Sequence, residues 1–470
     1  MITIKTLSNF FSCQHMLSSG APVPDCPPSK QVYKTTLNLA WPSVIERLLV
    51  SFVSALDTIM VGVLGASAIA AVGLTQQPTF ILLAVIFSLN IGVTAIVARR
   101  FGEENYENAN TILRQSIVLI TALSVILSCI FYVFAEPILA WMGAEPDVLP
   151  LSIDYFKIVL IGMPFNALSL NMNAAQRGAG NTKIAMRANI SANLVNLTIN
   201  FLLINGNFGF PALGVKGAAI GTLLGYMVAF SIALHGLLRS TSKLQLDLKS
   251  SWKLDKETIS SILGISSSAM VEQLCMRLGF LMYVKMITNL GTIAYATHQA
   301  CTSILNMTFS LGDGLSMAAS SFVGRNLGAK RPDLSIIYGK TCQRIGLILS
   351  SILVVIYLVF RKDLIGLFSD EPQIIALGSV IMLIVAIVTP LQTSQVIMSG
   401  SLRGAGDTKF VARTSFISIL LIRPVITFVF CYTFNLGLLG AWLALLLDQI
   451  IRLLFNFVRF SSGDWTKIKV

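Results

Sequence analysis

Carboxylic acids occur inside long apolar stretches of this sequence, where an ionisable side chain is unfavourable and therefore usually has a specific role. Glu46 and Asp57 share the first stretch, and Glu272 lies in a later one. An ionisable group at the centre of a bilayer costs about 3 kcal/mol on insertion scales. Burial also disfavours the charged form of a carboxylate, so such an acid can hold a proton and exchange it for a cation. We therefore predict that Asp57, Glu272 and Glu46 are cation-coupling residues.

Asp57 is the strongest of these candidates because other polar residues share its helical face. Glu46 precedes it by three helical turns, about 16 Å along a helix axis. Ser54 lies one turn before Asp57 and is placed to hydrogen-bond with it. The competing interpretation is structural, with Asp57 paired to an arginine such as Arg47 or Arg277.

A face of asparagines follows in the same half of the chain. The members, spaced 4, 3 and 4 apart, are Asn189, Asn193, Asn196 and Asn200. Four amides facing lipid would be very unfavourable, so this face must point toward other helices or water. It either joins helices by hydrogen bonds or forms the polar wall of a substrate cavity near Asp57; we favour the cavity wall.

The remaining polar residues of the apolar stretches carry weaker signals. Asp448 and Arg452 are one helical turn apart, which predicts a structural ion pair. Asp313, in a Gly-Asp-Gly sequence, is compatible with either a functional or a structural role. His298 and His235 lie near the ends of apolar stretches and are predicted to be interfacial residues rather than ligands.

The elements that position these residues are repeated at an offset of 226 residues. RGAGNTK at 177–183 returns as RGAGDTK at 403–409, and Glu46 returns as Glu272. Tyr283 stands where Asp57 would fall, so the two halves differ at the deepest acid; we place Tyr283 in the predicted cavity wall. The RGAG motifs lack the order of a phosphate-binding loop and are predicted to be cytoplasmic turns.

Composition identifies the class of protein. Hydrophobic residues make up 54% of the 470 residues and charged residues only 12%, against about 25% charged in soluble domains. Stretches of roughly 20 apolar residues, enough to cross a bilayer, recur along the chain. We predict an all-α integral membrane fold of twelve transmembrane helices in two six-helix lobes, with spans at 35–63, 72–98, 112–134, 152–175, 185–205, 213–236, 259–284, 295–322, 342–360, 374–399, 411–433 and 436–458.

The net charge of +12 reflects membrane topology. With both termini in the cytoplasm, 25 of the 34 lysines and arginines fall on the inner side, five on the outer side and four within spans. This excess is what the positive-inside rule produces. We therefore expect a multi-pass protein of the cell membrane, in contact with the lipid bilayer and not with nucleic acid.

The order of spans gives the domain organisation. We predict a cytoplasmic tail at 1–33, an N-lobe at 34–238, a cytoplasmic loop at 239–258, a C-lobe at 259–459 and a second cytoplasmic tail at 460–470. The first tail has no apolar core, which argues against a cleaved signal peptide. The seven cysteines lack CxxC spacing, so a disulfide framework or zinc site is not expected.

Close helix packing is predicted where small residues recur every four positions. Gly217, Gly221 and Gly225 form a GxxxGxxxG pattern at the start of the sixth span. Such a pattern lets two helix backbones approach each other closely.

Taken together, these motifs resemble the MATE (multidrug and toxic compound extrusion) family. The resemblance covers about residues 35–460. It is carried by DTIMVG at 57–62, the two RGAG motifs, VEQLCMRLGF at 271–280, and NLTINFLLI followed by GVKGAAIGT. It implies two six-helix lobes and antiport of organic cations against H⁺ or Na⁺. It also implies coupling roles for Asp57 and Glu272.

The sequence departs from some members of that family. Asn200 stands where some members carry an aspartate, and the tenth-span acid of some members is absent. These departures concern the ion that Asp57 binds. Both Na⁺ and H⁺ remain alternatives. No cofactor is implied beyond the coupling ion, and a monomer is expected.

The function predicted from the sequence is secondary active export of organic cations or drugs by alternating access. The alternatives are a flippase for lipid-linked precursors and an exporter of one specific metabolite. The sequence contains no nucleophile elbow and no HExxH motif, so an enzyme is not predicted.

Overall fold

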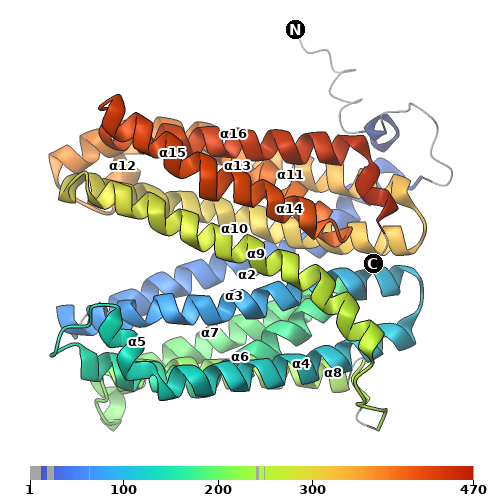
Figure 1. Ribbon diagram of the computed structural model, residues 1–470, viewed down its shortest axis with the longest axis horizontal. Helices are drawn as coiled ribbons and strands as arrows, with labels where there is room; N and C mark the ends of the chain where they lie inside the picture. Colours follow the sequence, from blue (N-terminus) through green and yellow to red (C-terminus); the bar gives the residue numbers. More distant parts are fainter. Residues whose placement is uncertain (1–11, 18–25, 63, 240–242, 248, 469–470) are drawn as a thin grey trace. The chain divides into compact units, whose positions relative to one another are not determined.

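The computed structural model describes residues 12–17, 26–62, 64–239, 243–247 and 249–468. Within these ranges the regular secondary structure is helical, joined by turns and irregular segments, and there is no β-strand. Figure 1 shows the long helices that make up most of the molecule.

Each of the twelve predicted spans corresponds to a long helical segment and extends at most two residues beyond it. In the first half these segments are α2 (Ser29–Gly62), α3 (Ala66–Gly102), α4 (Tyr106–Val133), α6 (Leu149–Gly178), α7 (Thr182–Asn205) and α8 (Val215–Leu238). In the second half they are α9 (Lys256–Thr288), α10 (Thr292–Gly328), α11 (Pro332–Val359), α13 (Pro372–Gly404), the segment Thr408–Thr433 and α16 (Gly437–Ser462).

Shorter elements join and interrupt the long helices. The segment Thr408–Thr433 comprises α14 (Thr408–Ser415), a π-helical stretch at Phe416–Ile422, α15 (Arg423–Phe428) and a second π-helical stretch at Val429–Thr433. Short connecting helices are α5 (Ala135–Trp141) and α12 (Arg361–Gly366), and the 3₁₀ turns are η1 (Cys13–Met16), η2 (Asn207–Gly209) and η5 (Asp464–Lys467).

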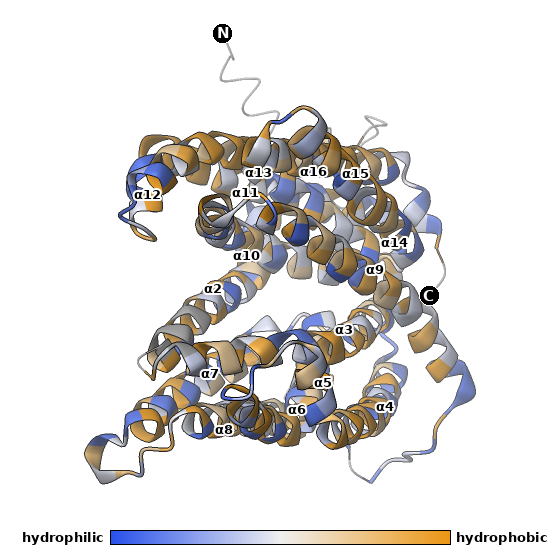
Figure 2. Ribbon diagram, turned by 60° about the vertical axis from the view of Figure 1, so that its left-hand side comes forward, coloured by the Kyte–Doolittle hydropathy of each residue, from blue (hydrophilic) through white to orange (hydrophobic). Residues whose placement is uncertain are grey.

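The long helices differ in mean hydropathy, and those of lower hydropathy carry several of the predicted polar residues. Among the described residues, nine helices are long and apolar enough to cross a bilayer. The long helices outside that set are α2, α7 and α10, which carry the predicted acids Glu46, Asp57 and Asp313 or the asparagine face. Figure 2 shows hydrophobic residues along most long helices. Hydrophilic residues occur in connecting elements such as the short helix α12.

The contacts within the chain divide it into two units. Unit 1 comprises Met1–Val44 and Val271–Val470, and unit 2 comprises Ile45–Met270. Both boundaries fall inside a helix, in α2 and in α9, at positions related by the 226-residue repeat. The predicted lobes, 34–238 and 259–459, are defined by the order of the spans and not by contacts, so their boundaries differ from those of the units. The lobe boundaries stay a prediction.

In unit 2 the glycine pattern of α8 brings this helix against α7. A Cβ atom placed on Gly217 would lie 2.6 Å from the Leu203 carbonyl oxygen, and one on Gly225 would lie 3.0 Å from the Ala192 oxygen. Such distances leave no room for a side chain, which confirms the close contact predicted from GxxxGxxxG.

In unit 1 the predicted N-terminal tail is partly packed. Helix α2 begins at Ser29, six residues before the predicted span, and the turn Cys13–Met16 packs against α11. Cys13 and Met16 are each 1% exposed, and Lys340 Nζ donates a hydrogen bond to the Met16 carbonyl at 2.6 Å. Small apolar residues within the polar tail supply this contact, which charge and composition alone did not reveal.

His298, predicted to lie at the membrane interface, is buried among aromatic side chains. His298 is 1% exposed and its ring lies 5.6 Å from both the Tyr283 and the Trp442 ring centroids. Aromatic packing with Tyr283 of α9 and Trp442 of α16 buries it, and Trp442 is far away in the sequence. His235, in contrast, is exposed in the last turn of α8.

Candidate functional site

The Asp57 carboxylate of α2 is held by amides from α7. Asn200 Nδ2 donates to Asp57 Oδ1 at 3.0 Å. The Asn196 amide, in the orientation that pairs donors with acceptors, donates to both carboxylate oxygens at 2.9 and 3.1 Å and accepts from the Thr222 backbone N–H at 3.1 Å. Within the described ranges no lysine or arginine forms an ion pair with Asp57, so the structural interpretation of this acid is not supported.

A second contact of the same kind lies along the same two helices. Asn189 Nδ2 donates to Glu46 Oε1 at 2.7 Å. The pairs Glu46–Asn189 and Asp57–Asn200 each join residues 143 positions apart. Helices α2 and α7 therefore run parallel in a fixed register, and the asparagine face lies against the two acids of α2.

Other residues predicted for this site have no described hydrogen bond to Asp57 or Glu46. Asn193 is half-buried, and the described residues give its side chain no hydrogen bond to either acid. The Ser54 side chain lies outside the described part of the structure. Thr222, which donates to Asn196, and Tyr155 and Tyr226, which lie near enough to Asp57 to interact with its charge, were not predicted. No residue pattern marks them, because they come from α6 and α8.

Glu46, unlike Asp57, has a cationic partner. Its side chain is 3% exposed, and Arg177 Nη1, from the first RGAG motif, lies 3.5 Å from Glu46 Oε1. This arginine compensates the charge of Glu46 inside unit 2, and Asn189 adds a hydrogen bond.

The same ion pair recurs in unit 1 between the repeat-related residues. Glu272 is 1% exposed and accepts two hydrogen bonds from Arg403 of the second RGAG motif, one from Nε at 3.3 Å and a short one from Nη2. This two-point geometry is the strong form of a guanidinium–carboxylate pair. In each half, the glutamate of the first long helix (α2 or α9) therefore pairs with the arginine near the end of the fourth long helix (α6 or α13).

The RGAG motifs are turns, as predicted, but their arginines have a further role that sequence reasoning missed. Gly180 and Gly406 have φ values of +82° and +90°, which favour glycine in the turn. Gly178 packs so closely on α3 that a Cβ atom would lie 2.8 Å from the Thr94 carbonyl oxygen. The retention of Glu and Arg in both halves was the signal that could have revealed the pair.

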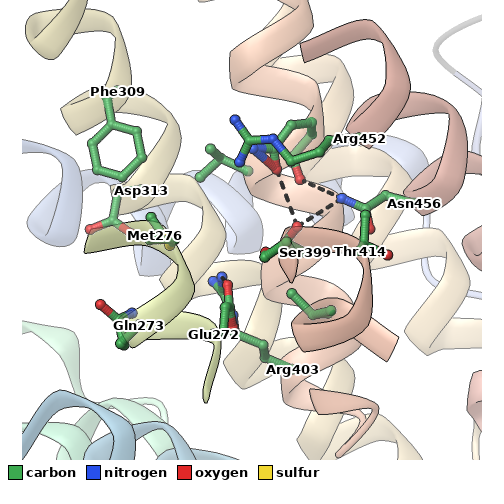
Figure 3. Close-up of a pocket in the computed structure, with 14 residues that line it drawn as sticks. Glu272, Gln273, Met276, Phe309, Asp313, Ser399, Arg403, Thr414, Arg452 and Asn456 are labelled. Carbon is green, nitrogen blue, oxygen red and sulfur yellow. Dashed lines mark hydrogen bonds and ion pairs between the residues drawn. The ribbon is translucent and has the colours of Figure 1, made fainter. Parts of the chain in front are cut away.

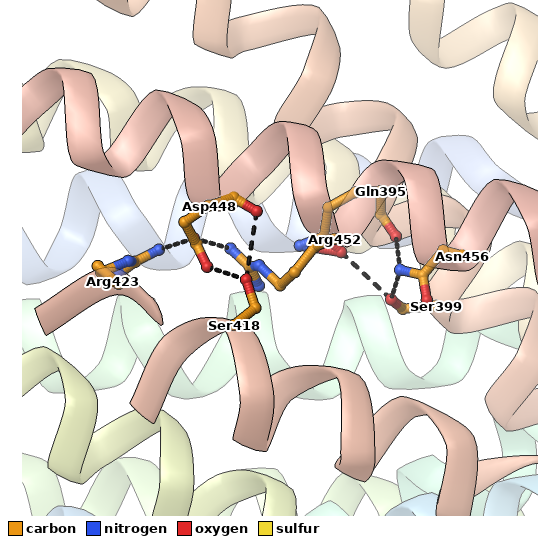
Figure 4. Close-up of polar contacts among 7 residues, drawn as sticks. All are labelled: Gln395, Ser399, Ser418, Arg423, Asp448, Arg452 and Asn456. Atoms are coloured by element: carbon orange, nitrogen blue, oxygen red, sulfur yellow. Dashed lines mark hydrogen bonds and ion pairs between the residues drawn. The ribbon is translucent and has the colours of Figure 1, made fainter. Parts of the chain in front are cut away.

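The Asp448–Arg452 ion pair is confirmed, and a second arginine joins it. Arg452 Nη2 lies 3.1 Å from Asp448 Oδ2, and Arg423 Nη2 binds the same oxygen at a shorter distance (Figure 4). Ser418, from a π-helical turn, donates to the other oxygen of Asp448, which is 0% exposed. Two guanidinium groups therefore share one fully buried carboxylate.

Tyr283, the counterpart of Asp57, has a packing role in unit 1. It is 1% exposed, and its hydroxyl donates to the Ala441 carbonyl at 3.0 Å. The Arg423 guanidinium lies 5.6 Å from the centre of its ring. Tyr283 does not line the cavity described next.

A cavity of about 100 Å³ lies among α9, α10, α13, α14 and α16 of unit 1 (Figure 3). Asp313, whose role the sequence left open, lines this cavity. The other lining residues are Glu272, Gln273, Met276, Phe309, Gln395, Val396, Ser399, Arg403, Val411, Thr414, Ser415, Arg452 and Asn456. Among the described residues no cluster of three or more metal-binding side chains occurs.

A helical bundle with many apolar spans and polar groups buried inside it defines a multi-pass membrane protein of the transporter class. The MatE family model matches residues 42–202 and 268–429, one match in each half. The chain therefore belongs to the MatE family of membrane transporters, and it is not an enzyme.

The chain is similar in sequence to bacterial transporters over nearly its whole length. It is 29% identical over 431 residues to the uncharacterized transporter YisQ of Bacillus subtilis, covering 91% of this chain and 94% of that protein. It is also 29% identical over 446 residues to the probable multidrug resistance protein NorM of Thermotoga maritima, covering 93% and 94%.

Solved structures of transporters share the fold. A MATE crystal structure in the bent conformation superposes with a TM-score of 0.84 at 21% identity, over 92% of this chain and 97% of that one. A MOP superfamily transporter from Pyrococcus furiosus, described as having a binding pocket of reversed polarity, superposes with a TM-score of 0.86 at 20% identity, over 93% and 97%.

The packing of Gly221 behind the Asp57 site gives a testable prediction. A Cβ atom at Gly221 would overlap Asn200 Oδ1 and lie 3.2 Å from the Asn196 carbonyl oxygen. We expect Gly221→Ala to displace Asn200 and destabilise the protein by about 1–3 kcal/mol, as overpacking does. Thermal unfolding of the full-length protein in detergent measures this. The matched control is Gly73→Ala, where a Cβ atom meets nothing within 4 Å; equal midpoints for the two variants would contradict the prediction.

Proposed function

We propose that this protein exports small organic cations in exchange for H⁺ or Na⁺, with Asp57 as the carboxylate that binds the coupling ion. The observation that carries the proposal is that amides, and no guanidinium or ammonium group of the described residues, hold Asp57. Neutral partners leave its negative charge available to a proton or a cation. The similarity to proteins named as probable multidrug resistance transporters supports organic compounds as the cargo.

Glu46 and Glu272 are less suited to this role, although both were predicted as coupling residues. Arg177 and Arg403 already neutralise them. A proton or metal ion would have to displace a guanidinium group before either glutamate could bind it. Asp57 has no such competitor, so we assign it the coupling step and retain the two glutamates as secondary candidates.

In the proposed cycle the protein opens alternately to the two sides of the membrane. An organic cation entering from the cytoplasm binds while Asp57 is charged and empty. H⁺ or Na⁺ from outside then occupies Asp57 and removes the charge that attracts the substrate, which lowers the affinity and promotes release. A single carboxylate thus couples the two movements in opposite directions.

One coupling carboxylate has an energetic consequence. Exchange of one H⁺ for one monovalent organic cation moves no net charge, so it gains nothing from the membrane potential, which supplies about 2.3 kcal/mol per charge at 100 mV. In proteoliposomes we therefore expect uptake driven by a pH gradient to be unchanged when a potassium diffusion potential is imposed. Marked stimulation by the potential would require a second coupling acid, such as Glu272.

The first test of the proposed function is efflux of a cationic rhodamine methyl ester from energised cells. Cells expressing the protein are compared with empty-vector cells, with and without Na⁺ and with a protonophore. Efflux above the vector level that either Na⁺ removal or the protonophore abolishes supports the proposal and identifies the ion. Absence of efflux for several organic cations would count against it and favour a flippase or an exporter of one metabolite.

We further propose that both termini face the cytoplasm and that the protein is a monomer in the cell membrane. The distribution of lysine and arginine supports this orientation. Topology reporters fused to each terminus test it, and an extracellular signal from either one would contradict it.

A further inference from the structure

A short turn that precedes α2 is docked on unit 1. This tail turn, Cys13–Met16, lies on α11, where Lys340 Nζ donates to the Met16 carbonyl oxygen at 2.6 Å. Cys13 and Met16 are each 1% exposed and share a hydrophobic cluster with Ile337 of α11. The tail turn is therefore held by a buried apolar contact and by a hydrogen bond from the helix.

A segment that precedes α9 is docked on unit 2 in a similar way. This loop segment, residues 243–247, lies on α4. Asn110 Nδ2 donates to the Lys243 carbonyl oxygen at 3.3 Å, and Asn110 Oδ1 accepts from the Gln245 N–H at 3.0 Å. Leu244, between the two, is 0% exposed. The loop segment is thus also held by a buried apolar side chain and by hydrogen bonds to its backbone.

The two docking positions are related by the 226-residue repeat. Thr341 of α11 donates from Oγ1 to Met16 Sδ at 3.7 Å, and its counterpart Gln115 of α4 donates from Nε2 to the Lys253 carbonyl oxygen at 3.4 Å. The helices that follow begin at Ser29 and Lys256, 227 residues apart (256 − 29). The docked residues themselves differ, CQHM against KLQL. The position is repeated while the sequence is not, which indicates that docking at this place is what both halves require.

Each docked segment is connected to the beginning of the helix that follows it. The Cys13 N–H donates to Ser29 Oγ at 3.0 Å, and Val32, 0% exposed, belongs to the same cluster as the tail turn. In the other half, Asp255 Oδ2 accepts from the Thr258 N–H at 2.9 Å, which caps the start of α9 directly after the loop.

The first parts of α2 and α9 continue along the same units. A Cβ atom on Gly314 of α10 would lie 2.7 Å from the Val44 Cα, and one on Gly92 of α3 would lie 3.1 Å from the Ile262 carbonyl oxygen. The second part of each helix belongs to the other unit and, in α2, carries Asp57. Each of these two helices therefore has its beginning in one unit and its end in the other.

We propose that the tail turn and the loop segment are two equivalent anchors, which keep the first parts of α2 and α9 attached to units 1 and 2 throughout the transport cycle. A helix attached to both units transmits movement from one to the other, whereas a helix detached at its beginning does not. Export therefore depends on both anchors, and the N-terminal tail is a working part of the transporter. The dependence of export on the anchors rests on the proposed function; the anchoring itself does not.

The test introduces a charge into each anchor separately. Met16→Lys puts an ammonium group into a buried position near Lys340, and Leu244→Lys does the same in the loop segment, so each should release its own anchor. The matched controls, Met16→Leu and Leu244→Met, keep an apolar side chain of similar volume. Hydrogen–deuterium exchange of the purified full-length proteins is measured over residues 33–40 of α2 and 260–267 of α9, one turn inside each helix.

We expect Met16→Lys to raise the exchange rate in residues 33–40 by about tenfold or more, the effect of exposing one buried apolar side chain. Exchange in residues 260–267 should stay at the wild-type rate. Leu244→Lys should give the reverse pattern, and the two controls should match wild type. Faster exchange in both helices would indicate general destabilisation. That result, or unchanged exchange in either lysine variant, would overturn the inference.

Efflux of the cationic rhodamine ester separates the anchors from the proposed function. Both lysine variants should lower the efflux rate several-fold at matched expression, while the controls retain it. Wild-type efflux in either lysine variant would overturn the requirement for that anchor in export. If wild type itself exports no organic cation, the exchange measurements still support or refute the anchors, and only the proposed function fails.

Discussion

Replacing Asp57 with asparagine is expected to reduce efflux of the cationic rhodamine ester to the level of empty-vector cells. Asparagine has the size of aspartate and still offers a carbonyl oxygen to the amides of Asn196 and Asn200, so the helix contact survives. It cannot bind and release a proton, and it attracts cations far less than a carboxylate does. The coupling step is therefore lost while the fold is retained.

A matched acid in the same unit provides the control for this variant. Asp154 pairs with Lys216 at 3.0 Å, and its side chain is 43% exposed. Such surface pairs contribute about 0–1 kcal/mol to stability. Asp154→Asn should keep wild-type efflux. Undiminished efflux in Asp57→Asn, at equal expression and equal thermal stability, would move the coupling site to Glu272 or Glu46.

Replacing Arg403 with glutamine is expected to cause a large loss of stability. Glu272, 1% exposed, would lose both of its hydrogen bonds to Arg403 and remain buried without compensation. Breaking a buried pair by removing one partner costs about 3–5 kcal/mol. The denaturation midpoint of the purified protein should fall by several degrees.

The double variant Glu272→Gln with Arg403→Gln should recover most of this loss, because it removes both charges. A double-mutant cycle measures the interaction between them. The corresponding cycle for Glu46 and Arg177 should give a smaller value, since Arg177 Nη1 and Glu46 Oε1 are 3.5 Å apart and Asn189 still binds Glu46. Additive effects in the Glu272–Arg403 cycle would show that the pair contributes no net interaction.

Much of this fold could be predicted from the sequence because the membrane imposes a simple rule. Each apolar stretch of about 20 residues must be a helix, since only a helix satisfies its own backbone hydrogen bonds in lipid. For the same reason the asparagine face had to point inward. The structure brings Asn196 and Asn200 to Asp57, close to the predicted site, but assigns Asn189 to Glu46.

The partners of the arginines could not be predicted in the same way. A pair such as Arg423–Asp448 depends on which helices are neighbours and on their rotation, and hydropathy carries no information about either. The repeat did contain part of the answer for Glu272 and Arg403, because both residues are retained with their counterparts in the other half. Positive charge near a cytoplasmic turn is also what the positive-inside rule predicts, so the charge alone does not indicate an ion pair.

The division of α2 between the two units has a consequence for how the protein is made. The first part of α2 packs through Leu39 and Ala40 against residues of α10 and α11, including Ala318 and Ile345. These partners are synthesised about 300 residues later, which at roughly 5–20 residues per second is a delay of about 15–60 s. The first helix to enter the membrane is thus among the last to be fully packed. Thr36 and Ser43, in the first part of α2, are both buried in the folded protein. Before α11 is inserted, these two residues lack their final neighbours.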